Sequence, residues 1–121
     1  MKIAVLDSNA LFFPFQFHID LEAELIGILG DCRVMVPEVV LRELRGLASS
    51  GRKNASAALK YAERFELLTD DSGLKGDEGV LAAVQKVKGI LVSSDRELIK
   101  KARAQGVRVI FLRERQKLDM K

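Results

Sequence analysis

Cysteine and histidine are scarce in this sequence, and their scarcity excludes several kinds of site. The 121 residues include one cysteine, Cys32, and one histidine, His18. A single thiol cannot form a disulfide within the chain, and this pair cannot supply the Cys/His cluster of a structural zinc site. The cysteine usage is therefore typical of a cytoplasmic protein.

Long apolar runs and glycine-rich phosphate loops are also missing. No apolar run approaches the roughly 18 residues that a membrane span needs, and no signal-peptide pattern opens the chain. The absence of a G-x-x-x-x-G-K-[ST] segment excludes a P-loop nucleotidase. We expect one cytoplasmic domain over residues 1–112 with no membrane partner, followed by a basic, flexible tail over residues 113–121.

Charge is unevenly distributed along the chain. The formal net charge is +3, but most charged residues of segment 1–31 are acidic, whereas most of those in segments 42–64 and 96–121 are basic. Basic segments in a small domain favour an anionic polymer as partner, nucleic acid above all, although solvated helix faces would give the same pattern. Our candidates for contacts with a nucleic-acid backbone are Arg42, Arg45, Arg52, Lys53 and Arg96.

Short apolar runs alternate with helical patterns. The predicted strands cover residues 2–6, 33–36, 65–69, 90–93 and 107–112, and the predicted helices cover residues 20–30, 37–47, 53–65, 77–88 and 94–106. Ser94 and Glu97 predict a capping box at the last helix. This alternation indicates an α/β fold, a three-layer α/β/α sandwich around a mainly parallel sheet. A doubly wound strand order such as 3-2-1-4-5 would place the first and fourth strands side by side.

Each of these two strands is followed by an aspartate. Asp7 comes directly after the first strand, and Asp95 follows the fourth. In the doubly wound order, the two carboxylates would emerge next to each other at the carboxyl edge of the sheet. Ligands of open α/β sheets bind at that edge.

Two further acids lie on the apolar sides of predicted helices. On a helical wheel Glu43 falls between Val39 and Leu47, and Asp77 lies within an apolar arc from which Glu78 points away. A carboxylate among apolar side chains is costly to bury unless its charge is paired.

Each acid also has a simpler explanation. The three aspartates lie near helix starts, where carboxylates are favoured as caps, and Glu43 could pair with Arg33 or Arg64. The coincidence of four such acids nevertheless favours a shared site. Carboxylates so close together repel one another and need cations, and oxygen ligands select Mg²⁺ or Mn²⁺ before zinc.

Four short segments, in this order, resemble the PIN-domain ribonucleases of the PilT N-terminus type. They are VLDSN at residues 5–9, VVLREL at residues 39–44, GDEGVLAA at residues 76–83 and LVSSDREL at residues 91–98. The likeness extends from Lys2 to Leu112 and is greatest to compact archaeal relatives of the rRNA-processing PIN nucleases.

The resemblance implies a fold, an activity and a set of site residues. It implies strand order 3-2-1-4-5 and a metal-dependent ribonuclease for RNA processing, which cuts RNA endonucleolytically and leaves a 5′-phosphate and a 3′-hydroxyl. The catalytic acids and ligands of Mg²⁺ or Mn²⁺ would be Asp7, Glu43, Asp77 and Asp95, with Asn9 and Ser93 as polar supports. The family often has a further acid where this chain has Ser93 and Ser94. Expected partners are RNA, a second copy of the chain, and either an antitoxin or a ribosome-assembly protein.

Three other functions compete with this interpretation. The first is the toxin ribonuclease of a toxin–antitoxin pair, and the second is a catalytically weak PIN fold that acts as an RNA-binding scaffold. The third is a phosphoacceptor receiver domain, with Asp70 or Asp71 as acceptor. A receiver would also need a lysine after the fifth strand, and residues 111–114 contain none.

Overall fold

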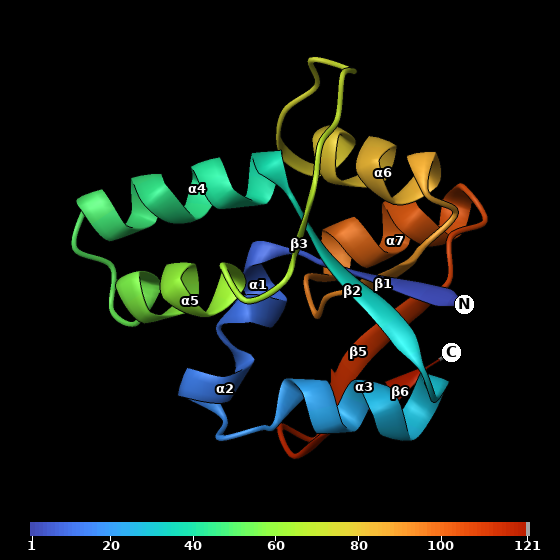
Figure 1. Ribbon diagram of the computed structural model, residues 1–121, viewed down its shortest axis with the longest axis horizontal. Coiled ribbons are helices and arrows are strands. Elements are labelled where there is room, and N and C mark those ends of the chain that lie inside the picture. The colour runs from blue at the N-terminus through green and yellow to red at the C-terminus, as the bar shows by residue number, and fades with distance from the viewer. Residues whose placement is uncertain (121) are drawn as a thin grey trace.

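Strands and helices alternate along the chain, as the hydrophobic pattern predicts (Figure 1). The computed structural model describes residues 1–120. Its elements are β1 (Lys2–Leu6), α1 (Ser8–Leu11), α2 (Phe13–Gln16), α3 (Leu21–Leu29), β2 (Cys32–Pro37), α4 (Glu38–Ser49), α5 (Ala55–Ala62), β3 (Glu66–Leu68), α6 (Gly76–Lys86), β4 (Ile90–Val92), α7 (Arg96–Ala104), β5 (Val109–Arg113) and β6 (Lys117–Met120).

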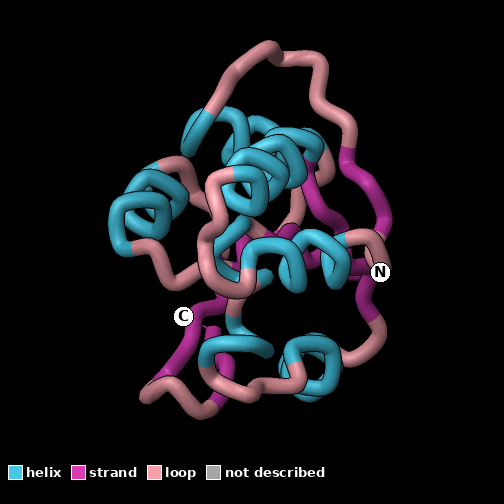
Figure 2. The backbone as a smooth tube through the Cα atoms, turned by 90° about the vertical axis from the view of Figure 1, so that its left-hand side faces the viewer, coloured by secondary structure: helices cyan, strands magenta, loops and turns pink. Residues whose placement is uncertain are grey.

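The strands form one sheet in the order β3-β2-β1-β4-β5-β6. Strands β1 to β5 pair in parallel, which confirms the predicted order 3-2-1-4-5. Figure 2 shows helices above and below the strands, as in a three-layer sandwich. The strands β1 and β4 lie side by side, with Leu6 opposite Val92, so the chain leaves both strands at the same point of the carboxyl edge.

The prediction of a flexible tail from residue 113 is wrong for the part of it that the structure describes. Residues 117–120 form β6, which pairs antiparallel with β5, and Leu118 is buried against the core. The backbone N–H of Leu118 also donates to Glu24 of α3 at 2.9 Å. The turn was missed because Glu114 and Arg115 both have positive φ, and glycine or asparagine usually marks such hairpin turns.

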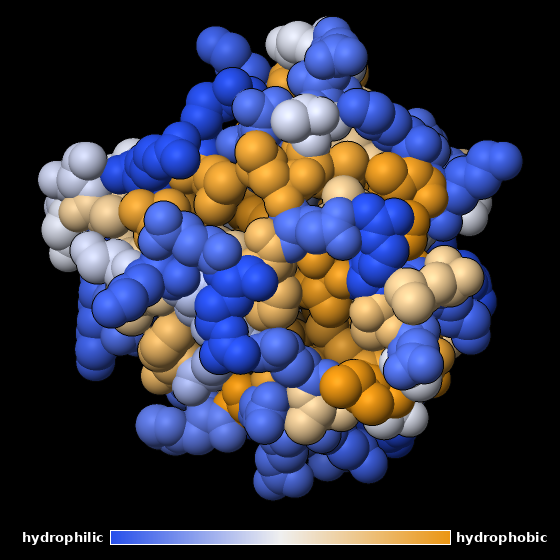
Figure 3. Space-filling view, viewed as in Figure 1, coloured by the Kyte–Doolittle hydropathy of each residue, from blue (hydrophilic) through white to orange (hydrophobic). Residues whose placement is uncertain are grey.

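The core surrounds the two central strands, which are buried on both faces as expected for a parallel sheet. The edge strand β3, at the end of the sheet away from β6, is less covered than these central strands, and its Leu67 is 49% exposed. Figure 3 shows an apolar area in the middle of the face that carries β3, crossed by hydrophilic side chains. Within residues 1–120, no helix has the length and apolar character that a membrane crossing requires.

Candidate acidic site

Asp7 lies at the junction between β1 and α1 and has two structural roles. Its Oδ1 accepts a hydrogen bond from the backbone N–H of Ala10 at 2.9 Å, so Asp7 is the N-cap of α1. Its Oδ2 accepts from the hydroxyl of Ser93 at 2.6 Å, because the register of β1 and β4 places the two residues side by side. Capping a helix and facing a neighbouring strand are therefore compatible for this side chain.

The environment of Asp7 disfavours its negative charge. The residue is only 5% exposed. Burial is the main cause that raises the pKa of Asp7 from 3.8 to about 7, and the charges of Asp95 and Glu43 raise it further. The hydrogen bonds from Ser93 and Ala10 act in the opposite direction but do not compensate. Asp7 is thus a buried carboxyl group that a nearby cation would stabilise in its charged form.

Hydrogen bonds join the ends of β1, β4 and β5 around Asp7. The Ser93 hydroxyl, which donates to Asp7, accepts from the backbone N–H of Asp95 at 3.0 Å. Asn9 Oδ1 accepts from the backbone N–H of Ser94 at 2.8 Å, and Ser94 Oγ accepts from the backbone N–H of Leu112 at 2.8 Å. Among residues 1–120, no buried side-chain nitrogen or oxygen lacks a hydrogen-bond partner. Asn9 and Ser93 therefore lie where polar supports of the acids are expected.

Asp95, and not Ser94, caps α7. Its Oδ1 accepts from the backbone N–H groups of Glu97 at 3.0 Å and Leu98 at 3.3 Å. The predicted capping box headed by Ser94 is wrong because the Ser94 hydroxyl is already bonded to Leu112 of β5. Asp95 is exposed at the carboxyl edge, close enough to Asp7 to raise its pKa.

Glu43 faces the site from α4 but is not buried. It lines a hollow of about 170 Å³ together with Ser8 and Asn9, on the side of α4 that the helical wheel indicates. Its side chain is exposed, so the expected burial within an apolar stripe is wrong. Pairing with Arg33 or Arg64 is also wrong, because these arginines bind Glu66 and Glu22.

Asp77 lies at the start of α6, and its side chain is 30% exposed, compared with 64% for Glu78. This difference agrees with the inward orientation predicted for Asp77. The α6 start approaches its neighbours closely, since a Cβ on Gly79 would lie 2.7 Å from the carbonyl oxygen of Leu74. However, Asp77 is not among the charges that raise the pKa of Asp7. It binds the ammonium group of Lys101 on α7 at 3.2 Å.

No sequence pattern singles out Lys101. Its ammonium lies between Asp77 and Glu78, at 3.2 Å and 3.7 Å, and the hydrogen bond to Asp77 raises the pKa of Lys101 above its usual value. The pairing depends on how α6 and α7 pack, which no local signal reveals. The structure thus brings Glu43 and Asp95 within electrostatic reach of Asp7 and holds Asp77 in an ion pair.

Two of the five candidate basic residues flank the acids. Arg52 lines the same hollow as Glu43, with its guanidinium 5.1 Å from the centre of the Phe12 ring. Arg96 lines a neighbouring hollow together with Asn9. The other three candidates, Arg42, Arg45 and Lys53, are exposed and line neither hollow.

The acids offer the donor chemistry of a hard divalent cation. Carboxylate oxygens are preferred by Mg²⁺ and Mn²⁺, and a cation beside Asp7 would offset the repulsion that raises its pKa. Within residues 1–120, no three His, Cys, Asp or Glu side chains are already gathered as a set of metal ligands. The donor types therefore fit such an ion, and the acids would have to draw together around it.

Comparison with solved structures defines the class of this fold. The structure of the PIN domain endonuclease Utp24 superposes with a TM-score of 0.83 and 24% sequence identity, over 98% of this chain and 90% of that chain. A chain of VapBC2 from Rickettsia felis, solved bound to a DNA fragment from its promoter, superposes with a TM-score of 0.67 and 16% identity, over 91% of this chain and 98% of that chain. The sheet and its helices thus have the PIN fold.

Sequence comparison then gives the family. Ribonuclease VapC9 of Archaeoglobus fulgidus is 33% identical over 118 residues, which cover 94% of this chain and 85% of that protein. A family model described as a PIN like domain matches residues 4–115. The chain belongs to the family of PIN like domains.

Proposed function

We propose that this protein is a divalent-metal-dependent endoribonuclease that hydrolyses phosphodiester bonds of RNA. The observation that carries the proposal is the position of Asp7, a buried carboxyl group at the carboxyl edge of a PIN fold. Burial and the charges of two further acids raise the pKa of Asp7 to about 7. Such a group holds its charge best beside a cation. The name of ribonuclease VapC9, a relative along nearly the whole chain, supports RNA as the substrate.

The proposed ligands of Mg²⁺ or Mn²⁺ are Asp7, Glu43, Asp77 and Asp95. When bound, the ion supplies the charge that lowers the pKa of the attacking water and stabilises the anionic transition state. Asp77 joins the other acids by exchanging its present contact with Lys101, which lies at 3.2 Å.

The remaining residues of the site orient these acids. The Ser93 hydroxyl fixes the Asp7 carboxylate and the backbone of Asp95 at the same time. Asn9 holds the Ser94 amide and thereby the loop that carries Asp95. Arg52 lines the hollow that contains Glu43, and Arg96 lines the adjoining hollow, so both can bind backbone phosphates near the acids.

A toxin ribonuclease of a toxin–antitoxin pair is the second candidate, and the 33% identity to ribonuclease VapC9 favours it. In that case the partner is an antitoxin protein, and in the case of RNA processing it is a ribosome-assembly protein. The chemistry proposed for the acids is the same in both cases. A homodimer is compatible with either function.

Cleavage of RNA by the wild-type protein and by Asp7→Asn tests the activity. We expect Mn²⁺ to support endonucleolytic cleavage of a labelled RNA, EDTA to abolish it, and Asp7→Asn to reduce the rate by about 10²–10³-fold, as for loss of one group that stabilises transition-state charge. Asp31→Asn is the matched control, because Asp31 is exposed and lies outside the site. Cleavage by Asp7→Asn at the wild-type rate would refute the proposal, and RNA binding without cleavage would identify a scaffold.

A further inference from the structure

A row of three hollows leads away from the acids toward the space between α7 and β5. The site hollow contains Asn9, Gln16 and Glu43, and has a volume of about 170 Å³. The middle hollow, of about 460 Å³, shares Asn9 and Gln16 with it. The outer hollow, of about 410 Å³, lies between α7 and β5 and shares Arg96 with the middle hollow. Because neighbouring hollows share lining residues, they adjoin one another, and we call the row of three the track.

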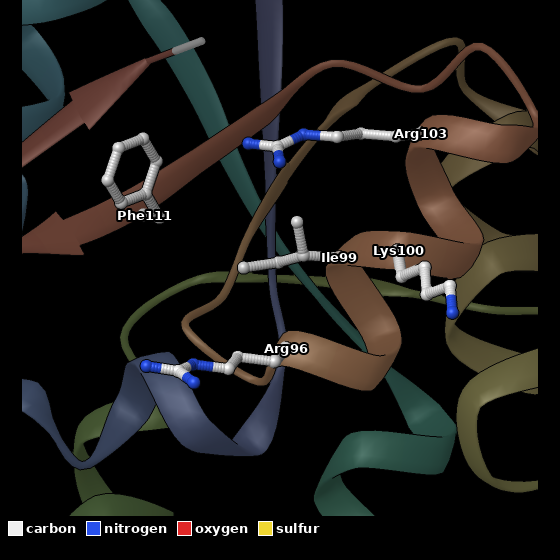
Figure 4. Close-up of a pocket in the computed structure, with 5 residues that line it drawn as sticks. All are labelled: Arg96, Ile99, Lys100, Arg103 and Phe111. Atoms are coloured by element: carbon white, nitrogen blue, oxygen red, sulfur yellow. The ribbon is translucent and has the colours of Figure 1, made fainter.

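The outer hollow combines an aromatic ring with arginines and has no acid. Its lining consists of Arg96, Ile99, Lys100, Arg103 and Phe111. In Figure 4, Arg96 and Arg103 extend from α7 toward the side where Phe111 stands on β5, whereas the Lys100 ammonium turns away. Two guanidinium groups beside a partly exposed aromatic ring can bind a phosphate and stack with a base. The volume lies within the range of about 300–1,000 Å³ that is usual for sites of small organic groups.

The middle hollow keeps the same character between the outer hollow and the acids. Phe17 and Arg115 line it together with Arg96. Glu114 is the acid that also lines this hollow, and the adjacent Arg115 and Arg96 outweigh its charge. A polyanion that extends from Phe111 over the middle hollow to the acids would therefore meet no stretch of net negative charge on the way.

We propose that the outer hollow is a binding subsite for a nucleotide of single-stranded RNA, on the α7–β5 side of the bond that the acids cut. The inference rests on the proposed function, which identifies the bound polymer as RNA. A base stacks on Phe111, and Arg103 and Arg96 bind the adjoining phosphates. Stacking on Phe111 requires an unpaired base, so the subsite selects single strands over duplexes. An acidic protein segment could bind the arginines, but it would gain nothing from the aromatic ring or from the connection to the acids.

Equilibrium binding of labelled RNA to full-length Asp7→Asn protein tests this subsite without cleavage. The probes are single-stranded uridine 4-mers and 12-mers, a 12-base-pair RNA duplex and a glutamate 12-mer peptide as competitor. We expect Phe111→Leu to weaken binding of the single-stranded 12-mer roughly 5- to 100-fold, the range for loss of one base–aromatic stack, and to affect the 4-mer less. We expect Phe111→Tyr, which keeps an aromatic ring, to bind the 12-mer as tightly as the parent. A loss of affinity caused by general misfolding at this position would affect both variants.

Arg103→Ala reports on the phosphate contact. The logarithm of its association constant for the 12-mer should fall less steeply with the logarithm of the salt concentration. The slope should be smaller by about 0.7, the value for one phosphate of a single strand. The matched control is Arg108→Ala, because Arg108 is also exposed and basic but lines hollows at the amino edge of the sheet with Lys88. It should bind the 12-mer like the parent.

Several results would overturn the subsite. The first two are that Phe111→Leu binds the 12-mer as tightly as the parent, or that Phe111→Tyr binds it as weakly as Phe111→Leu. The other two are that the duplex binds more tightly than the single strand, or that the glutamate peptide competes as strongly as RNA. Cleavage is measured separately on proteins that retain Asp7. Wild-type cleavage with no effect of Phe111→Leu on binding refutes the subsite alone. Absence of wild-type cleavage with weakened binding by Phe111→Leu refutes the nuclease and supports the subsite.

Discussion

The buried charge of Asp7 should make the metal-free protein less stable as the pH rises. The pKa of Asp7 is about 7 in the folded protein, above its usual value of 3.8. The folded state therefore binds the proton more tightly than the unfolded state. The resulting penalty is absent below about pH 4, grows as the pH rises toward 7 and is complete above it. At 1.36 kcal/mol for each pKa unit, it reaches about 4 kcal/mol.

Asp7→Asn removes this titration and keeps the size of the side chain. The amide oxygen of the variant side chain can still accept from the Ala10 N–H, but its amide nitrogen cannot accept from the Ser93 hydroxyl, a loss of about 1 kcal/mol at all pH values. Between pH 5 and pH 8.5, the free energy of unfolding of the variant should rise by about 3 kcal/mol relative to wild type. The substitution that we expect to slow cleavage should thus stabilise the protein at alkaline pH.

Urea unfolding followed by circular dichroism measures this difference. Both proteins are unfolded in EDTA at pH 5, 6, 7 and 8.5, and the difference between their unfolding free energies is plotted against pH, so that all other titrating groups cancel. A difference that stays constant over this range would refute the assignment of Asp7 as a buried, protonatable acid. Added Mn²⁺ should stabilise wild type more than the variant, because binding to the native state alone adds to its stability.

Two further predictions concern α6 and its ion pair. Gly79→Ala should lower the free energy of unfolding by about 1–3 kcal/mol, because its Cβ would meet the Leu74 carbonyl oxygen at 2.7 Å, whereas Gly46→Ala, with nothing within 4 Å, should be neutral or stabilising in α4. Urea midpoints measure both, and equal effects would contradict the close approach. Lys101→Met should tighten Mn²⁺ binding in calorimetry, because Lys101 competes with the ion for Asp77, while Lys60→Met on the exposed face of α5 should not. Unchanged or weaker Mn²⁺ binding by Lys101→Met would contradict this competition.

The sequence predicts the position of Asp7 and Asp95 better than that of the other two acids. A short apolar run that ends in a carboxylate identifies the end of a parallel strand, and the strand order then brings Asp7 and the loop after β4 together. This information is local except for the order of the strands, which the family resemblance supplied and the structure confirms. Both aspartates are helix caps, and this geometry is compatible with the site interpretation.

The helical wheel gives a direction but not the depth of burial or the partner of a side chain. Glu43 points to the correct side of α4 yet remains exposed, because the hollow in front of it is open. Asp77 points inward and meets Lys101, a contact that depends on how the two successive helices α6 and α7 pack against each other. The strand β6 was missed for a related reason, since its pairing partner and the support from Glu24 are both non-local.

The two serines after β4, Ser93 and Ser94, tie the loop of residues 93–95 to its neighbours by hydrogen bonds. The amides of Ser94 and Asp95 lie outside any strand, yet each donates to a side chain: Ser94 to Asn9 of α1, and Asp95 to Ser93, which directly follows β4. Surface loops usually exchange their amide hydrogens through small local openings. Here an opening would have to break the bond to Asn9 of α1 and the bond from Leu112 of β5 to the Ser94 hydroxyl, so these two amides should exchange with solvent more slowly than those of an ordinary surface loop. Asp95 is thus exposed to solvent on a backbone that hydrogen bonds to α1 and β5 hold in place.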